Sequence, residues 1–226
     1  MSFFNFAWTW LTSSAQWHGA DSIPVRVAQH LGYAGLSLLI AALIAVPLGV
    51  LIGHTGRGSF VVINLANVWR AIPTLGLLII LVVYFGFSIF TWLIPLVALA
   101  IPPILVNAYE GVAGVDPDLK DAALGMGMTQ WEVLRKVEIP LATPLIVLGL
   151  RTAAIFVVAT ATIAAEIALG GLGRYIIDGL NSDNYGEVAG GAVILVVLAI
   201  AVQVLFVGVR RLVVPAGLRQ QARAAR

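Results

Sequence analysis

The side chains most able to do chemistry are scattered along this sequence and do not form a catalytic group. His18, His30 and His54 are far apart, and no cluster of acids accompanies them. There is no cysteine, which excludes disulfides and thiolate metal sites. The sequence therefore gives no support to metal-dependent hydrolysis or intramembrane proteolysis. We expect no metal site and no catalytic residue.

A glycine-rich stretch, residues 53–59 (GHTGRGS), superficially resembles a phosphate-binding loop. Such a loop needs a lysine directly before its final serine or threonine to reach the phosphates. Here Gly58 precedes Ser59, and the stretch joins two apolar segments. We therefore expect this chain to bind no nucleotide or other cofactor of its own.

Residues 121–140 (DAALGMGMTQWEVLRKVEIP) form a polar, helix-forming insert in an otherwise apolar chain. Just before them, Asp116 can cap a helix whose first residue is Pro117, and Gly125 or Gly127 can end it. Residues 129–132 (TQWE) then have the S/T-x-x-E form of a capping box, which predicts a second short helix.

The second short helix is predicted to be amphipathic. An apolar residue recurs every three positions, opposite the polar Glu132, at Met128, Trp131, Leu134 and Val137. We expect Pro140 to end this helix and Pro144 to start the next membrane span. Two capped helices and an exposed Trp131 favour a cytoplasmic docking element over a solvated hairpin without a partner.

The composition predicts an all-α, polytopic membrane protein. The chain is 60% hydrophobic and 11% charged, and its mean hydropathy is +0.99. Long runs of Leu, Val, Ile and Ala replace the alternation of a barrel. The net charge of +2 gives no reason to expect a nucleic-acid partner. We expect membrane lipid to surround about five transmembrane helices, at residues 31–53, 61–85, 89–109, 144–165 and 188–209.

Basic residues predict the orientation of these spans, because cytoplasmic loops carry an excess of Lys and Arg. One side would hold only Arg26 and Arg174. The other side would hold Arg57, Lys120, Arg135, Lys136, Arg210, Arg211, Arg219, Arg223 and Arg226. The N-terminus is therefore expected outside and the C-terminus in the cytoplasm. We expect an extracytoplasmic or interfacial aromatic segment (1–30), a transmembrane domain (31–209) with a cytoplasmic loop (110–143), and a basic tail (210–226); a disordered 1–30 segment is the alternative.

The polar insert resembles the EAA loop of ABC-importer permeases. That pattern, E-A-A-x3-G-x9-I-x-L-P, is matched in spacing by Asp121, Ala122, Ala123, Gly127 and residues 137–140 (VEIP). Asp121 stands in place of the Glu of this pattern, Val137 in place of the Ile and Ile139 in place of the Leu. The resemblance implies that Asp121, Ala122, Ala123, Gly127, Trp131, Glu132 and Pro140 belong to an ATPase-coupling loop of a type I ABC importer transmembrane domain.

Further segments resemble permeases for the osmoprotectants glycine betaine, carnitine and choline. They are residues 71–75 (AIPTL), 107–111 (NAYEG), 149–153 (GLRTA) and 170–173 (GGLG). In that family small or apolar residues are usual just before the GGLG segment, and Glu166 departs from this pattern. Its charge changes the electrostatic potential expected at the outer opening of the pathway. A permease for methionine or another amino acid is an alternative, and a gated osmotic channel is an alternative of another class.

The resemblance also implies partners. A cytoplasmic ABC ATPase dimer would hold the ATP and Mg²⁺, an extracytoplasmic solute-binding protein would deliver the solute, and a second, identical or related, permease subunit would complete the pathway. The chain would lie in the plasma membrane of a prokaryote and would not itself be an enzyme.

Candidate pathway residues lie where polar groups or proline interrupt the apolar spans. Arg70 is costly in a bilayer and precedes Pro73, where a helix loses a backbone hydrogen bond. Non-helical backbone at this depth is tolerated where it lines a cavity. We interpret Trp69, Arg70, Pro73, Thr74, Asn107 and Glu166 as candidates for the pathway or its gate, with plain packing as the alternative. Arg151 is expected to be structural, reaching the interface or pairing with Glu110 or Glu138.

The predicted topology can be tested by labelling single cysteines, since the chain contains none. A cysteine at Ser88 should react with a membrane-impermeant maleimide added outside intact cells. Cysteines at Gln130 and near the C-terminus should react only after the membrane is opened. External labelling of Gln130→Cys would contradict the whole orientation.

Overall fold

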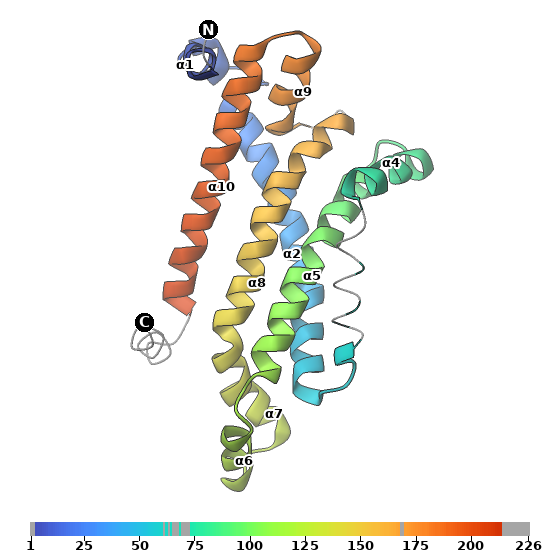
Figure 1. Ribbon diagram of the computed structural model, residues 1–226, viewed down its shortest axis with the longest axis vertical. Coiled ribbons are helices and arrows are strands. Elements are labelled where there is room, and N and C mark those ends of the chain that lie inside the picture. The colour runs from blue at the N-terminus through green and yellow to red at the C-terminus, as the bar shows by residue number, and fades with distance from the viewer. Residues whose placement is uncertain are drawn as a thin grey trace. The chain divides into compact units, whose positions relative to one another are not determined.

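The computed structural model describes residues 3–60, 62, 64, 68, 73–167 and 170–213. Every regular element within these residues is helical, as the composition predicts. Apolar runs of Leu, Val, Ile and Ala form long helices because, in a bilayer, only intrachain bonds can satisfy the backbone. Figure 1 shows these long helices.

Four described helical runs are long and apolar enough to cross a membrane. They are Ile23–Thr55, Ile89–Ala113, Gln130–Ile163 and Tyr185–Val213. The first, second and fourth correspond to α2, α5 and α10 (Figure 1). The third joins α7 (Gln130–Val133), a π-helical segment (Leu134–Glu138), α8 (Ile139–Thr160) and the start of a 3₁₀ segment, Ala161–Ile167. The expected span at 61–85 is represented by the shorter α4 (Thr74–Phe85), and most of 61–72 lies outside the described residues.

Two of these helices begin earlier than expected from the sequence. α2 begins at Ile23, not near residue 31, and includes Arg26 and His30. His30 is fully buried, and its Nε2 donates to the Val158 carbonyl at 2.9 Å. His30 can therefore lie inside a membrane helix despite its polarity, because its side chain has a hydrogen-bond partner within the protein. α10 likewise begins at Tyr185 and continues to Val213.

The described chain divides into two compact units, and the long helices α2, α5, α8 and α10 contribute residues to both. The first unit comprises Met1–Leu39, Pro73–Leu99 and Ala154–Gln203. The second comprises Ile40–Ile72, Ala100–Ala153 and Val204–Arg226.

The first unit is held together by an aromatic cluster. α1 (Phe3–Leu11) places Trp10 edge-on against Tyr175 of α9 (Gly173–Asn181), with ring centroids 4.9 Å apart. The Trp10 ring also covers Gly190 of α10, where an added Cβ would clash with that ring. Burial raises the pKa of Tyr175 to about 12, so its hydroxyl stays protonated and donates to the Asp21 carbonyl at 2.5 Å.

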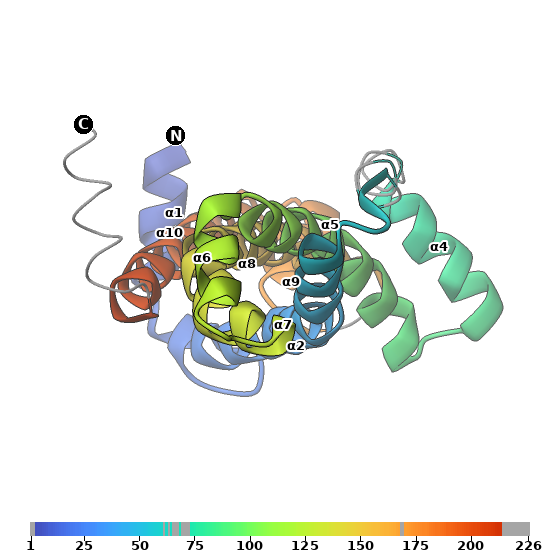
Figure 2. The same cartoon turned by 90° about the horizontal axis from the view of Figure 1, so that it is seen from below.

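The second unit depends on close approach of helix backbones. A Cβ added at Gly49 of α2 would lie 2.7 Å from the Leu105 carbonyl oxygen of α5, and one at Gly149 of α8 would lie 2.7 Å from the Pro103 carbonyl oxygen. Small residues at such contacts let membrane helices pack closely. This unit also carries α6 (Pro117–Gly125) and α7, which lie side by side at its end (Figures 1 and 2).

Candidate functional site: the α6–α7 loop

α6 forms where local sequence signals predict it. The Asp116 side chain accepts a hydrogen bond from the Asp118 amide at 2.9 Å, and Pro117 occupies the first turn. At the other end Gly127 has a φ of 88°, a backbone angle that favours glycine. The Gly127 amide donates to Leu124, and the Met128 amide donates to Ala123. This pair of bonds is a Schellman motif, which ends the helix and turns the chain sharply.

α7 begins with the predicted capping box. The Glu132 amide donates to the Thr129 hydroxyl at 3.3 Å, and the Glu132 carboxylate accepts from the Thr129 amide at 3.0 Å. Lys136 bonds to the same carboxylate at 2.8 Å, one helical turn further on. These contacts fix the start of α7 directly after the Gly127 turn.

The expectation that Pro140 ends the second short helix is wrong. The helix continues through Leu134–Glu138 as π-helix and becomes α8 at Ile139, so Pro140 lies in the first turn of α8 and Pro144 lies inside it. The Ile139 amide donates to the Leu134 carbonyl, five residues back. This wider turn lets the continuous helix accommodate the Pro140 ring and its missing amide proton, both of which would disturb a regular α-helix. α7 and the following span are therefore one continuous rod.

The two short helices expose both polar and apolar side chains. Within the EAA-like segment, Asp121 and Ala122 are exposed and Ala123 is buried. The large apolar side chains exposed nearby are Leu119 (50%), Met126 (74%) and Trp131 (59%). Arg135 lies over the Trp131 ring, 5.9 Å from its centroid, and can hold that ring in place. We name Leu119, Asp121, Met126 and Trp131 the knob surface.

A buried ionic contact joins this loop to the long helices of the second unit. The Glu138 side chain is only 2% exposed and has two partners from different elements. His54, at the end of α2, donates from Nδ1 to Glu138 Oε2 at 2.5 Å. Lys120 of α6 bonds through Nζ to Glu138 Oε1 at 2.9 Å. We name His54, Lys120 and Glu138 the buried triad.

The buried triad makes α6 part of the membrane scaffold. A carboxylate taken out of water is costly unless it is paired, so its partners must follow it when it moves. Glu138 belongs to the rod that becomes α8, and His54 belongs to α2. The buried triad therefore connects α6 to the ends of both helices.

The buried triad is not predictable from the sequence alone. Glu138 was one of two acids expected to pair with Arg151, whereas its carboxylate oxygens bond to His54 and Lys120. His54 and Glu138 are 84 residues apart, and no local pattern connects them. The signal present in the sequence was Glu138 itself, a lone acid just before a long apolar span.

The candidate pathway residues fall in different parts of the chain. Trp69 and Arg70 lie outside the described residues. Pro73 precedes α4, whose first residue is Thr74, in the first unit. Asn107 belongs to the second unit, where its side-chain amide donates to the Pro103 carbonyl at 2.7 Å. Glu166 lies in the 3₁₀ segment Ala161–Ile167. A role of these residues in a pathway stays a prediction.

Comparison with known families decides the identity of the chain. Residues 45–217 match the binding-protein-dependent transport system inner membrane component family. The chain belongs to this family. It is a permease subunit of an ABC importer, in agreement with the EAA-like spacing, and a multi-pass inner membrane protein.

Named relatives match nearly the whole permease. The glycine betaine/carnitine/choline transport system permease protein OpuCB of Bacillus subtilis is 36% identical over 86% of this chain and 89% of its own length. The choline transport system permease protein OpuBB of the same organism is 34% identical over 86% and 90%. The osmoprotectant import permease protein OsmW of Salmonella typhimurium is 32% identical over 84% and 91%.

Solved structures confirm the fold. A chain of the MetNI methionine ABC transporter in an inward-facing conformation superposes with a TM-score of 0.72. The match covers 84% of this chain and 95% of that one at 23% identity, and it shows a shared fold. The expected importer transmembrane architecture is thereby confirmed.

The buried triad predicts unequal effects of two lysine substitutions. Lys120 and Lys136 each bond to a glutamate, at 2.9 and 2.8 Å, but Glu138 is 2% exposed and Glu132 is 39% exposed. Lys120→Met should lower the free energy of unfolding by about 3 kcal/mol, because it removes a partner from a buried charge. Lys136→Met should have little effect, since exposed ion pairs contribute little. Thermal unfolding of the purified permease in detergent measures both, and equal midpoints would contradict the role given to the triad.

Proposed function

We propose that this permease imports quaternary ammonium osmoprotectants, namely glycine betaine, carnitine or choline. The observation that carries the proposal is the match to relatives named for these solutes, at 32–36% identity over more than four fifths of the chain. Segments resembling osmoprotectant permeases, such as residues 107–111 and 149–153, support the same solute class. The likeness to the methionine transporter concerns the fold, so it does not favour methionine as the solute.

The partners follow from membership of a binding-protein-dependent importer family. We infer that the knob surface docks on a separate cytoplasmic ATPase dimer, which holds ATP and Mg²⁺. Its exposed Leu119, Met126 and Trp131 supply apolar anchors, and Asp121 supplies a charge at the same place. An extracytoplasmic solute-binding protein and a second permease subunit complete the proposed assembly.

The proposed orientation places the N-terminus outside and the C-terminus in the cytoplasm. It rests on the excess of basic residues in the second unit, including Arg57, Arg135 and Arg210. This orientation puts the knob surface on the side where ATP is available.

The proposed coupling uses rigid connections. ATP-driven closure of the ATPase dimer would displace α6 and α7 together, because the Gly127 turn and the capping box join them tightly. α7 passes the displacement along its rod into α8, and the buried triad passes it to α2. Both α2 and α8 continue into the first unit, so a movement at the knob surface can change access at their far ends.

The solute class is tested by uptake in proteoliposomes that contain the permease, its ATPase and its binding protein. Uptake of radiolabelled glycine betaine should require ATP inside and the binding protein outside. Excess carnitine or choline should compete with it, because a site for one quaternary ammonium group accepts its analogues. Vesicles without the binding protein are the control. Competition by methionine alone would reject the solute class and leave the importer family intact.

Coupling is tested at Gly127. Gly127→Glu should abolish both uptake and solute-stimulated ATP hydrolysis, because a side chain disfavours the φ of 88° and adds a charge beside the docked partner. Asp121→Ala should be milder, since it leaves the backbone of the turn unchanged. Rates of uptake and of hydrolysis in the same proteoliposomes measure the two steps.

Gly58→Glu is the matched control for Gly127→Glu. Gly58 has the same φ of 88°, and an added Cβ meets no atom within 4 Å at either position. The two variants therefore carry the same backbone strain, yet only Gly127 belongs to the α6–α7 loop. Gly58→Glu should retain transport, and full ATPase stimulation and transport in Gly127→Glu would show that this loop is not the coupling element.

A further inference from the structure

The first helix, α1, carries an apolar surface that nothing else in the first unit covers. Ala7 and Trp10 are buried on the side that packs against this unit. Phe4 and Trp8, one helical turn apart on another side, are 78% and 71% exposed. We name Phe4 and Trp8 the apolar face of α1.

A separate polar face lies beside the apolar face. Asn5 and Thr9 are exposed on α1, and the exposed Thr12 follows directly after it at the same helical spacing. The Thr9 hydroxyl donates to the Asn5 carbonyl at 2.9 Å, and the Thr12 hydroxyl donates to the Trp8 carbonyl at 2.8 Å. We name Asn5, Thr9 and Thr12 the polar face of α1.

Contacts with α10 show in which direction the apolar face points. The Phe6 ring lies near Tyr185, the first residue of α10, with ring centroids 6.4 Å apart. Trp10 lies against Gly190, further along α10. At about 100° per residue, both residues of the apolar face lie about 160° around α1 from Phe6. The apolar face therefore points away from the start of α10 and along its apolar run.

α1 lies across the first turns of α10, and the surface of α10 beyond it is open. Figure 1 shows α1 end-on and α10 lengthwise, and Figure 2 shows α1 lengthwise. Val197 and Ala201 follow Gly190 at helical spacing on the same side of α10, in the first unit, and both are exposed. In a membrane-spanning helix, such exposed apolar side chains are suited to lipid. The apolar face of α1 is thus continuous with a surface that lipid can cover.

We propose that α1 is an interfacial helix whose partner is the lipid bilayer itself. Its apolar face enters the edge of the hydrocarbon layer, and its polar face lies among the headgroups. Tryptophan and other aromatic side chains are typical of this layer. A second protein copy that covered both faces would remove the Asn5 amide from water, which is costly without new hydrogen bonds. At the boundary of a bilayer both faces are satisfied at once.

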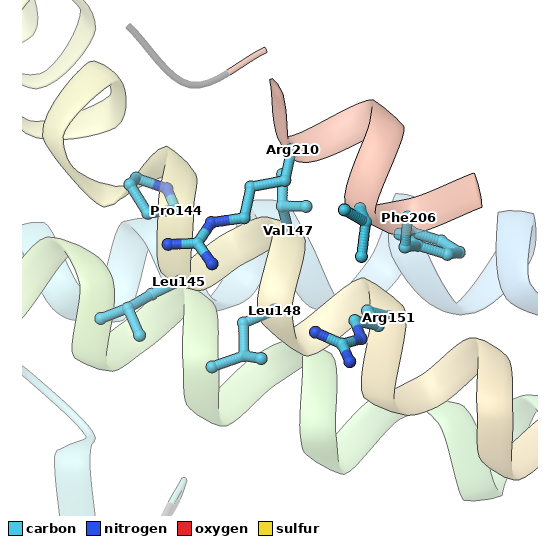
Figure 3. A pocket seen from close by; sticks show the side chains of 8 residues that line it. Pro144, Leu145, Val147, Leu148, Arg151, Phe206 and Arg210 are labelled. Carbon is cyan, nitrogen blue, oxygen red and sulfur yellow. The ribbon is translucent and has the colours of Figure 1, made fainter. Parts of the chain in front are cut away.

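The attachment of α1 is expected to rest on aromatic side chains and not on charge. A groove of about 180 Å³ in the second unit shows the contrast, since Arg151 extends into view from α8 and Arg210 from α10 beside apolar side chains (Figure 3). Residues 3–11 contain no acidic or basic residue. α1 should therefore reach the same depth in neutral and in anionic lipid.

An interfacial α1 would fix the depth of the elements packed against it. Trp10 contacts Tyr175 of α9 and covers Gly190 of α10, so α9 and the start of α10 would be held at the level of the headgroups. The inference does not depend on the solute. It also holds for either orientation of the chain, because both leaflets have such a boundary.

The test measures which medium surrounds each face of α1. Single cysteines in the cysteine-free, full-length permease carry a nitroxide label, and the protein is placed in phosphatidylcholine nanodiscs. Oxygen concentrates in the hydrocarbon, whereas a water-soluble nickel complex stays outside it, and electron paramagnetic resonance detects both. Labels at Phe4→Cys and Trp8→Cys should meet mainly oxygen. Labels at the adjacent Asn5→Cys and Thr9→Cys should meet mainly nickel.

Two further positions calibrate the measurement. Val197→Cys, on the exposed apolar side of α10, gives the value for lipid, and Gln130→Cys, exposed in α7, gives the value for water. The four α1 positions should give the same pattern when phosphatidylglycerol is added to the nanodiscs. Unchanged size-exclusion profiles show that each labelled variant is folded.

A pair of double variants tests the contact without a label. Phe4→Ser with Trp8→Ser removes the apolar face, while Asn5→Ser with Thr9→Ser changes the polar face and is the matched control. Amide hydrogen exchange of residues 3–11 in nanodiscs should become about tenfold faster in the first, because burial of an aromatic side chain contributes at least that factor. The control should exchange like the wild type, and both keep Trp10.

Three results would overturn the proposal. Nickel that reaches the labels at 4 and 8 as readily as those at 5 and 9 would place the whole helix in water. Labels at 4 and 8 that neither reagent reaches would show that protein, such as a second copy of this chain, covers the apolar face. Equal exchange rates in the two double variants would show that lipid does not hold α1.

Discussion

The cost of a buried carboxylate is the constraint on which the second unit depends. Glu138 is almost completely removed from solvent, and in such surroundings its charge requires close partners. His54 and Lys120 supply them from α2 and α6. Because both partners are needed, the end of α2, α6 and the start of α8 cannot shift independently. Helices that only packed through apolar side chains could slide over one another at far lower cost, since lipid replaces such contacts readily.

The α6–α7 loop is also rigid, and its rigidity comes from local hydrogen bonds. A Schellman turn at Gly127 and a capping box at Thr129 follow each other without a flexible connection. The hydrogen bonds of this turn join residues within five positions of one another, so the turn keeps its shape without help from the membrane. Rigid local structure and one buried ionic contact together tie the loop to the ends of α2 and α8, as the proposed coupling requires.

Features that depend on neighbouring residues were predictable from the sequence, and long-range contacts were not. Asp116, Thr129 and Gly127 act on residues within five positions, so their roles followed from spacing alone. α9 was missed because its pattern is short and lies between two apolar spans. His54 and Glu138 meet only through the fold. Pro140 misled the prediction because the sequence does not show that a π turn precedes this proline and lets the helix continue through it.

The π-helical segment Leu134–Glu138 has a consequence for where this protein can tolerate the insertion or deletion of a residue. A π turn holds one residue more than the α turn that it replaces, so the rod contains one residue more than a uniform α-helix with the same number of turns. Deleting one residue there would restore a uniform α-helix. Because a π turn and an α turn cover the same rotation, the α6–α7 loop and the span would keep nearly the same angular phase after that deletion. Deleting one residue from the regular part of α8 would instead rotate the two sides by about 100° relative to each other. A single deletion is therefore better tolerated within Leu134–Glu138 than elsewhere in the rod.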